Sequence, residues 1–324
     1  MKRKLALGVI ISAFFLWLAS RGIDWKQFRE AFAGANYFYV IPGVVFTMLG
    51  HFTRAVRWRY MMVPVKDCRI RPLWAATAIA FMVNNLLPAR LGELVRAFVI
   101  GRSQNVSRSA SFATIVYERV IDVFGLIIQL WVCMVLISGP AWVTRSTEIL
   151  IVLNLAIFVL LWAMVRWRTR FRALTAWMTR PFPSETQHRL HVSADSFVVG
   201  LGAVTRPRLA LPIAILSVIV WGSAVLALHF CVLALGLKVP WVASLFVIAL
   251  ISLGSMIPSA PAFLGTLQYA CVVALGIYGI DRANALAFSA VYHATQFLPI
   301  TLTGLYYAWK SHLHWRELSE GRLS

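Results

Sequence analysis

Charged residues are scarce in this chain. They make up 13% of 324 residues, and 12 of them are acidic against 31 Lys and Arg. Soluble domains usually carry about a quarter charged residues. The scarcity, with 60% hydrophobic residues and a mean hydropathy of +0.75, predicts an integral membrane protein. The basic residues lie between apolar runs, which is typical of membrane topology signals and argues against a nucleic-acid partner.

Several chemical motifs are also missing. The four cysteines are far apart in sequence, so they form no zinc or redox motif, and we expect neither a metal nor a disulfide. The sequence lacks the G-x-x-x-x-G-K-[ST] loop and the H-E-x-x-H and G-x-S-x-G motifs. We therefore expect no cofactor and no catalytic residues, and we do not predict an enzyme.

Long apolar runs are abundant instead. A membrane span needs about 20 apolar residues, within a range of about 17–25. Six segments approach or exceed that length: 5–20, 35–51, 111–138, 148–165, 209–235 and 284–308. The first resembles a signal peptide, but bulky Trp17 and Leu18 occupy the cleavage region, so we expect a retained helix. Two broken apolar regions, 73–101 and 241–278, are predicted to be re-entrant hairpins.

The distribution of Lys and Arg predicts the orientation. The segments 52–72 and 166–208 are basic and should be cytoplasmic, as should both termini, in a bacterial inner membrane. The segment 21–34 could form an interfacial helix on the outer face. Counting crossings then places hairpin 73–101 on the inner face and hairpin 241–278 on the outer face. Opposite hairpins, each followed by a span, indicate an inverted repeat, an architecture typical of secondary transporters.

The predicted fold is therefore an all-α polytopic membrane protein, with about six spanning helices and two re-entrant hairpins in an inverted repeat. It forms a single integral membrane domain over residues 1–324. The first half covers 5–165, a basic cytoplasmic linker with a surface helix near 187–204 covers 166–208, and the second half covers 209–310.

The first hairpin carries one group of candidate substrate-binding residues. They are Asn84, Asn85, Pro88, Arg90, Glu93 and Arg96. Pro88 ends a helix, so the next limb should begin with free backbone N–H groups and a positive dipole end, which favours phosphate. Arg90 and Arg96 add positive charge. The alternative is a structural role in which Glu93 neutralises both arginines at the membrane interface.

A second group lies within the span 111–138. Glu118 and Asp122 are four residues apart and share one helix face, where two unpaired carboxylates would repel each other. Arg119 should point away from Glu118 but can pair with Asp122, and an arginine of the first hairpin can pair with Glu118. Two interpretations stay open: a binding or proton-transfer site, and an ion-pair network that locks the helices together.

The second hairpin and the last span carry a third group. Its members are Pro258, Pro261, Gly265, Gln268, His293 and Gln296. Proline and glycine break a helix there, which the membrane interior tolerates only around a protein-lined or wet cavity. His293 and Gln296 are three residues apart and face one side. A lone histidine is more often a satisfied core residue, so its role stays open.

Three arginines, Arg54, Arg57 and Arg59, flank Trp58 at the end of the second predicted span. The simpler interpretation is an interfacial anchor. The alternative is contact with anionic lipid headgroups, which makes Arg57 a further candidate binding residue.

Four motifs resemble those of the lysylphosphatidylglycerol synthase transmembrane-region family, also called the flippase-like domain family. They are Arg54-Ala-Val-Arg57-Trp58, Asn85-Leu-Leu-Pro88-Ala-Arg90-Leu-Gly92-Glu93, Glu118-Arg119-Val-Ile-Asp122 and Pro258-Ser-Ala-Pro261-Ala-Phe-Leu-Gly265. The resemblance implies lipid translocation or the handling of a lipid-linked substrate. It does not imply aminoacyl transfer, because no synthase domain accompanies the motifs.

The chain departs from this family at the second hairpin. Ala262 and Phe263 stand where the family often has glycines. Gln268 stands where Glu is common, and His293 where an Arg is frequent. If that Glu and Arg couple transport to charge, this protein couples differently.

We predict a lipid transporter that moves a phospholipid or a polyprenyl-phosphate-linked lipid across the inner membrane. The phosphate-bearing headgroup would lie between the two hairpins. The alternatives are a membrane-embedded transferase acting on a lipid-linked sugar and a non-transporting partner of a lipid-modifying enzyme. The expected partners are an anionic lipid and, among proteins, a second copy of the chain or a lipid-synthesis enzyme.

Overall fold

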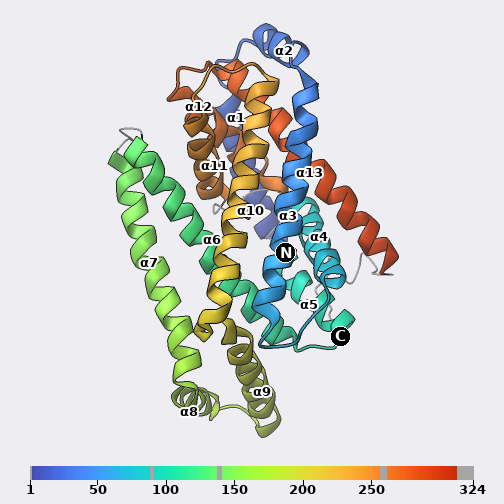
Figure 1. The fold of residues 1–324 in the computed structure, drawn as a ribbon, viewed down its shortest axis with the longest axis vertical. Helices are drawn as coiled ribbons and strands as arrows, with labels where there is room; N and C mark the ends of the chain where they lie inside the picture. Colours follow the sequence, from blue (N-terminus) through green and yellow to red (C-terminus); the bar gives the residue numbers. More distant parts are fainter. Residues whose placement is uncertain (1, 88–90, 137–140, 256–260, 312–324) are drawn as a thin grey trace.

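The chain folds into an elongated helical bundle (Figure 1). The computed structural model describes residues 2–87, 91–136, 141–255 and 261–311, and every regular element in them is helical. The α-helices are α1 (Lys2–Ser20), α2 (Trp25–Ala33), α3 (Val40–Met62), α4 (Ile70–Leu86), α5 (Gly92–Gln104), α6 (Arg108–Leu136), α7 (Ala141–Arg166), α8 (Arg168–Thr179), α9 (Ser184–Gly200), α10 (Pro207–Ala234), α11 (Trp241–Ser255), α12 (Thr266–Gly276) and α13 (Arg282–Lys310). The 3-10 helices are η1 (Tyr37–Tyr39), η3 (Leu201–Thr205) and η4 (Pro261–Phe263). The all-α prediction is confirmed.

Within the described residues, four helical stretches are long and apolar enough to cross a membrane. They are Tyr37–Met62, Arg108–Leu136, Thr147–Arg166 and Pro207–Ala234. At most 33% of each apolar stretch is buried inside the bundle, so most of its side chains face outward, where lipid can cover them. The chain is therefore a polytopic membrane protein. The other two predicted spans correspond to α1 and α13, which are outside this group of four, so a total of six stays a prediction.

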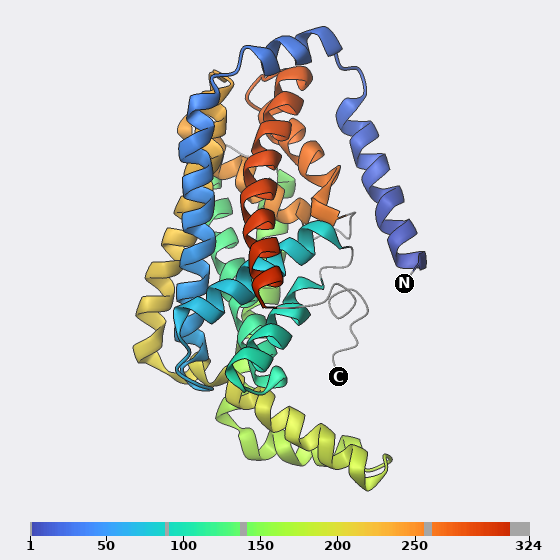
Figure 2. The same ribbon diagram turned by 90° about the vertical axis from the view of Figure 1, so that its right-hand side faces the viewer.

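Two pairs of shorter helices lie at opposite ends of the bundle. In Figures 1 and 2, α4 and α5 occupy the lower half, whereas α11 and α12 occupy the upper half. The members of each pair pack against each other. Each pair has its own apolar core, with Trp58 and Ile79 buried at the α4–α5 end and Phe246 and Phe288 buried at the α11–α12 end.

The first helix pair is closely packed at Gly92, the first residue of α5. Its backbone N–H donates a hydrogen bond of 2.9 Å to Asn84 Oδ1 on α4. A β-carbon at Gly92 would collide with the Ala80 carbonyl oxygen and would lie 2.6 Å from Asn84 Oδ1. Glycine is therefore required by the close approach of the two helices.

Replacing Gly92 with alanine should lower the free energy of unfolding by about 1–3 kcal/mol, because the added methyl group overpacks the contact with α4. Thermal unfolding of the purified protein would measure the loss. Gly222→Ala on α10 is the matched control, since a β-carbon there meets nothing within 4 Å. Equal stability of the two variants would contradict the close packing.

Polar elements lie at the two ends of the bundle. The helix α2 lies at one end, and α8 and α9 lie at the other, as Figure 1 shows. Surface helices were predicted in the segments 21–34 and 187–204. The helix α2 lies within the first segment, and α9 covers most of the second. Arg172 Nε donates a 2.6 Å hydrogen bond to Asp195 Oδ1, which joins α8 to α9 and holds the pKa of Asp195 below its ordinary value.

Candidate functional site

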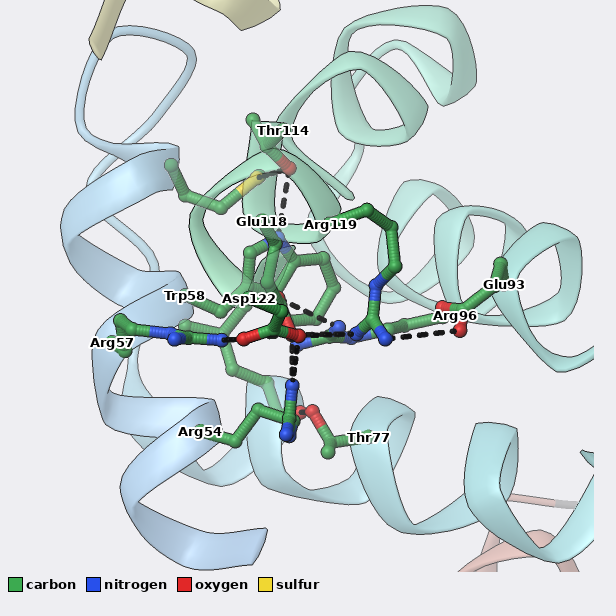
Figure 3. Close-up of polar contacts among 12 residues, drawn as sticks. Arg54, Arg57, Trp58, Thr77, Glu93, Arg96, Thr114, Glu118, Arg119 and Asp122 are labelled. Atoms are coloured by element: carbon green, nitrogen blue, oxygen red, sulfur yellow. Dashed lines mark hydrogen bonds and ion pairs between the residues drawn. The ribbon is translucent and has the colours of Figure 1, made fainter. Parts of the chain in front are cut away.

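Seven charged side chains from three helices meet beside the first helix pair (Figure 3). We call this set the ion cluster. Its members are Arg54 and Arg57 on α3, Glu93 and Arg96 on α5, and Glu118, Arg119 and Asp122 on α6. The two α3 arginines are three residues apart and the two α6 carboxylates four apart, so each pair projects from one face of its helix.

Asp122 binds both arginines of α3. Its Oδ2 lies 2.6 Å from Arg54 Nη1, and its Oδ1 lies 2.6 Å from Arg57 Nη2. Arg57 is completely buried and also donates a 2.9 Å hydrogen bond from Nη1 to Ser217 Oγ on α10. This part of the ion cluster therefore connects α3, α6 and α10.

Glu118 lies at the centre of the ion cluster and is completely buried. Its Oε2 accepts a 2.8 Å hydrogen bond from Arg96 Nη1. Its Oε1 lies 3.0 Å from Arg119 Nη2 and 3.2 Å from Arg54 Nη1. One carboxylate thus contacts arginines from all three helices, and we expect its removal to leave several of them poorly neutralised.

Arg96 has hydrogen-bonding capacity that the protein leaves unused. Its guanidinium carbon lies 3.9 Å from the centre of the Trp58 ring, a cation–π distance. Trp58 Nε1 is fixed in turn by a 2.8 Å hydrogen bond to Thr114 Oγ1. Among the residues that the structure describes, the buried Nε and Nη2 atoms of Arg96 have no hydrogen-bond partner, and neither does Nε of Arg57. Such groups usually find an acceptor when they are buried.

The described part of the ion cluster carries four arginines against three carboxylates, an excess of one positive charge. An uncompensated charge is costly to bury. Arg119 and Glu93 form the exposed edge, with 43% and 28% of their side chains accessible and 3.9 Å between their charged atoms. A partly exposed arginine at the edge of a positive cluster suits a phosphate group, which arginine can bind through two parallel hydrogen bonds.

One expectation about pairing is wrong, and the predicted pairing of a first-hairpin arginine with Glu118 is confirmed for Arg96. Arg119 was expected to point away from Glu118, but its long side chain folds back along α6 and brings Nη2 to within 3.0 Å of Glu118 Oε1. Glu93 forms a described ion pair with Arg119, whereas Arg90, its partner in the structural alternative, lies outside the described residues. Arg96 pairs instead with Glu118, because α5 packs against α6.

The interfacial interpretation of Arg54 and Arg57 is also wrong. Both belong to the ion cluster, because α3 continues beyond them to Met62 and packs against α6 and α10. Trp58 is buried between them and Arg96. On the sequence alone, headgroup contact was an alternative for Arg54, Arg57 and Arg59 together, but only Arg57 was a candidate binding residue, although the spacing of three places Arg54 and Arg57 on one helix face.

The asparagines of the first hairpin serve as structural contacts. The Gly92 N–H was expected to be free for phosphate, but Asn84 accepts its hydrogen bond. Asn85 Nδ2 donates a 2.8 Å hydrogen bond to Thr301 Oγ1 on α13. Pro88 and Arg90 lie outside the described residues, and so does Pro258 of the second hairpin.

The third predicted group comes together only in part. Pro261 begins η4, and Gly265 adopts a positive φ of 89° just before α12. The Gly265 N–H donates 2.7 Å to Gln268 Oε1, and Gln268 Nε2 lies 3.0 Å from His293 Nδ1 on α13. Gln296 Nε2 donates separately to Thr47 Oγ1, at 2.6 Å. In the described parts of the chain, these hydrogen bonds do not reach the ion cluster.

Gln268→Ala should destabilise the protein by about 1–3 kcal/mol, because it removes the hydrogen-bond partner of the Gly265 N–H and of His293 Nδ1. Gln268→Glu should cost less, since a carboxylate oxygen can still accept from Gly265. Thermal unfolding of both variants would test this. A larger loss in Gln268→Glu would measure the cost of burying a carboxylate, whereas no loss in Gln268→Ala would contradict the role of Gln268.

Comparison with known proteins gives a consistent result. Residues 5–304 match the family described as the lysylphosphatidylglycerol synthase TM region. A UPF0104 membrane protein of Methanocaldococcus jannaschii is 27% identical over 68% of this chain and 91% of its own length. A UPF0104 membrane protein of Methanothermobacter thermautotrophicus is 23% identical over 94% and 95% of the two lengths. Both relatives are archaeal, so a bacterial inner membrane stays a prediction. The chain belongs to the lysylphosphatidylglycerol synthase transmembrane-region family.

Proposed function

We propose that the protein translocates a phosphate-bearing lipid between the leaflets of the membrane. The observation that carries this proposal is the excess of buried positive charge in the ion cluster, together with the unpartnered Nε and Nη2 atoms of Arg96. A lipid phosphate supplies the missing negative charge and the missing acceptors. Membership of a family named for lysylphosphatidylglycerol synthesis is compatible with a lipid substrate.

The partly exposed edge of the ion cluster suggests how a headgroup is received. Arg119 makes two of the longer contacts in the cluster, 3.4 Å to Asp122 Oδ2 and 3.9 Å to Glu93 Oε1. In the proposed mechanism, a phosphate first replaces these contacts at Arg119 and then accepts hydrogen bonds from the unpartnered Nε and Nη2 atoms of Arg96. Glu118 and Asp122 meanwhile continue to hold Arg54 and Arg57. The carboxylates keep the arginines in position between transport events, and the headgroup first meets Arg119, the most exposed of them.

Helix packing supports alternating access by two inverted repeats, α3–α6 and α10–α13. The first helices of the two units, α3 and α10, pack against each other. The first hairpin helix of each unit packs against the last helix of the other, α4 against α13 and α11 against α6. We propose that the two pairs are re-entrant hairpins, and that rocking of the two units exposes the site to each side in turn. The basic α8–α9 end would face the cytoplasm.

A non-transporting partner of a lipid-modifying enzyme is the second candidate. The complete burial of Glu118 among four arginines favours it, since a closed ion-pair network can serve purely to hold helices together. A transport assay separates the two candidates, because a protein whose ion cluster only holds helices together would not move a phosphate-bearing lipid.

The test is a headgroup-accessibility assay in proteoliposomes. Fluorescent phosphatidylglycerol, a fluorescent short-chain polyprenyl phosphate and a phosphate-free fluorescent diacylglycerol are incorporated in both leaflets, and a membrane-impermeant reductant is added outside. We expect the protein to accelerate loss of inner-leaflet fluorescence for at least one phosphate-bearing lipid, compared with protein-free vesicles. No acceleration for either phosphate-bearing lipid, with and without an imposed proton gradient, would contradict transport.

A further inference from the structure

The helices α8 and α9 form an arm that projects sideways from the bundle, as Figure 2 shows. The arm begins directly after α7, and Trp167 lies between the end of α7 and the start of α8. In Figure 2 the arm slopes obliquely away from the long axis of the bundle, whereas α7 runs roughly along that axis in Figure 1. A helix in this position would lie along a membrane surface if α7 spans the membrane.

The polar face of α8 is turned toward α9. Arg172 and Arg168 contact Asp195 on α9, at 2.6 and 3.9 Å. Thr179 Oγ1 of α8 lies 3.1 Å from His191 Nε2 of α9. In a helix pair that is surrounded by water, apolar side chains would normally fill this contact. Here ion pairs and a polar contact join the two helices.

The apolar face of α8 is exposed. Leu174, Trp177 and Met178 are 50%, 64% and 59% exposed, and their spacing of three and four residues places them on one side of the helix. Contiguous exposed apolar residues usually mark a surface that something else covers. The helix α8 thus turns polar side chains toward α9 and apolar side chains outward. An amphipathic helix surrounded by water would have the opposite arrangement.

The exposed apolar face continues the lipid-facing surface of α7. Trp167 is 48% exposed, and its ring meets that of Trp162, in the last turns of α7, edge to face at 5.9 Å. Outward-facing residues of α7 include Val152 and Val159, at 69% and 58% exposed. Tryptophan is enriched where a spanning helix meets the membrane interface. Lipid that covers α7 would therefore reach α8 without a break.

The charge of the arm indicates which lipid. Residues 168–200, which form the arm, contain five arginines and two acidic residues. Arg166, Arg170 and Arg180 are exposed beside the apolar face, and the Arg170 guanidinium lies 5.7 Å from the centre of the Trp167 ring. Arginines beside an inserted apolar face attract anionic headgroups.

We propose that α8 is an interfacial helix that docks on the anionic lipid surface of the adjacent leaflet. Leu174, Trp177 and Met178 insert among the lipids, and the exposed arginines bind the headgroups. The arm thereby fixes the depth of the α7 end in the membrane. This inference rests on the arm alone and is independent of lipid transport by the ion cluster.

The test uses the full chain in nanodiscs. The four native cysteines are buried, so a single introduced cysteine can be labelled with an environment-sensitive fluorophore. Trp177→Cys reports on the apolar face, and Ala176→Cys, exposed on another side of the same turn, is the matched control. In discs of phosphatidylcholine with phosphatidylglycerol, we expect blue-shifted emission and quenching by nitroxide-labelled lipid at position 177, and quenching by aqueous iodide at position 176.

The charge contribution needs a second comparison. Discs of phosphatidylcholine alone should give weaker lipid quenching at position 177, and Arg170→Gln with Arg180→Gln should remove the difference between the two membranes. Equal iodide access at positions 176 and 177 in anionic discs would overturn the proposal. Protection of position 177 from iodide in a lipid-free amphiphilic polymer would also overturn the proposal, because the apolar face would then be covered by protein and not by lipid.

Discussion

Glu118→Gln should lower the free energy of unfolding by about 3–5 kcal/mol, the usual cost of removing one partner from a buried ion pair. Glu118 contacts Arg54, Arg57, Arg96 and Arg119 and is fully buried. The substitution keeps the size of the side chain but leaves four arginines against two carboxylates. Thermal and chemical unfolding of the purified protein would measure the loss.

Two variants make this result specific. Glu185→Gln removes an ion pair that is shorter than any described contact of Glu118, 2.6 Å to Arg189, but the Glu185 side chain is 79% exposed, so the expected cost is about 0–1 kcal/mol. Arg119→Gln balances the described cluster at three arginines and three carboxylates, so it should cost less than Glu118→Gln. A loss in Arg119→Gln as large as that in Glu118→Gln would contradict the excess of positive charge.

Arg119→Gln should slow translocation of a phosphate-bearing lipid by about tenfold or more. A hydrogen bond to a charged group contributes about 1.5–3 kcal/mol, and each 1.4 kcal/mol is about a factor of ten in an equilibrium constant. Arg119 is the most exposed arginine of the ion cluster and therefore the side chain that a headgroup would meet first. Proteoliposome rates at equal protein density would measure the effect.

Arg59→Gln is the matched control for transport. Arg59 is 42% exposed against 43% for Arg119, and it forms a 3.1 Å ion pair with Asp67 away from the ion cluster. Its loss should leave the rate within about twofold, as expected for a surface pair. Arg119→Lys should keep part of the rate, because lysine retains the charge but not the two-pronged donor geometry. Equal slowing in Arg59→Gln and Arg119→Gln would indicate a general effect of surface charge.

Most helices could be predicted from the sequence, because the length of an apolar run determines whether a helix can cross a membrane. The interruption near Pro88 separated α4 from α5, and the interruption near Pro261 separated α11 from α12. The helix ends were less predictable. The helix α3 was expected at 35–51 but continues to Met62, because its arginines are neutralised by α6 and need not end the helix.

The ion cluster could be predicted only in part, because helix packing rather than spacing chooses the partners. Glu118 and Asp122 were correctly placed on one face from their separation of four residues. Their partners Arg54 and Arg57 lie more than sixty residues earlier, and no local pattern connects the two helices. Asn84 was misjudged for a similar reason, since a side chain eight residues away occupies the Gly92 N–H.

The second hairpin shows how the departures from the family are accommodated. Gln268 and His293 stand where Glu and Arg are common, and their side chains meet at 3.0 Å. A hydrogen bond thus joins α12 to α13 at positions where an ion pair would otherwise be expected. Charge in the described site is therefore concentrated in the first half of the chain, on α3, α5 and α6.

The central claim is that the ion cluster accommodates a phosphate, and the most direct measurement is ligand-induced stabilisation of the purified protein. Thermal unfolding would be followed with a short-chain polyprenyl phosphate, with phosphatidylglycerol and with phosphate-free diacylglycerol. A ligand at a hundredfold excess over its Kd stabilises a protein by about 2.7 kcal/mol. We predict stabilisation by a phosphate-bearing lipid in the wild type and in Arg59→Gln, and its loss in Arg119→Gln. Equal stabilisation of all three proteins, or stabilisation by diacylglycerol alone, would contradict the account.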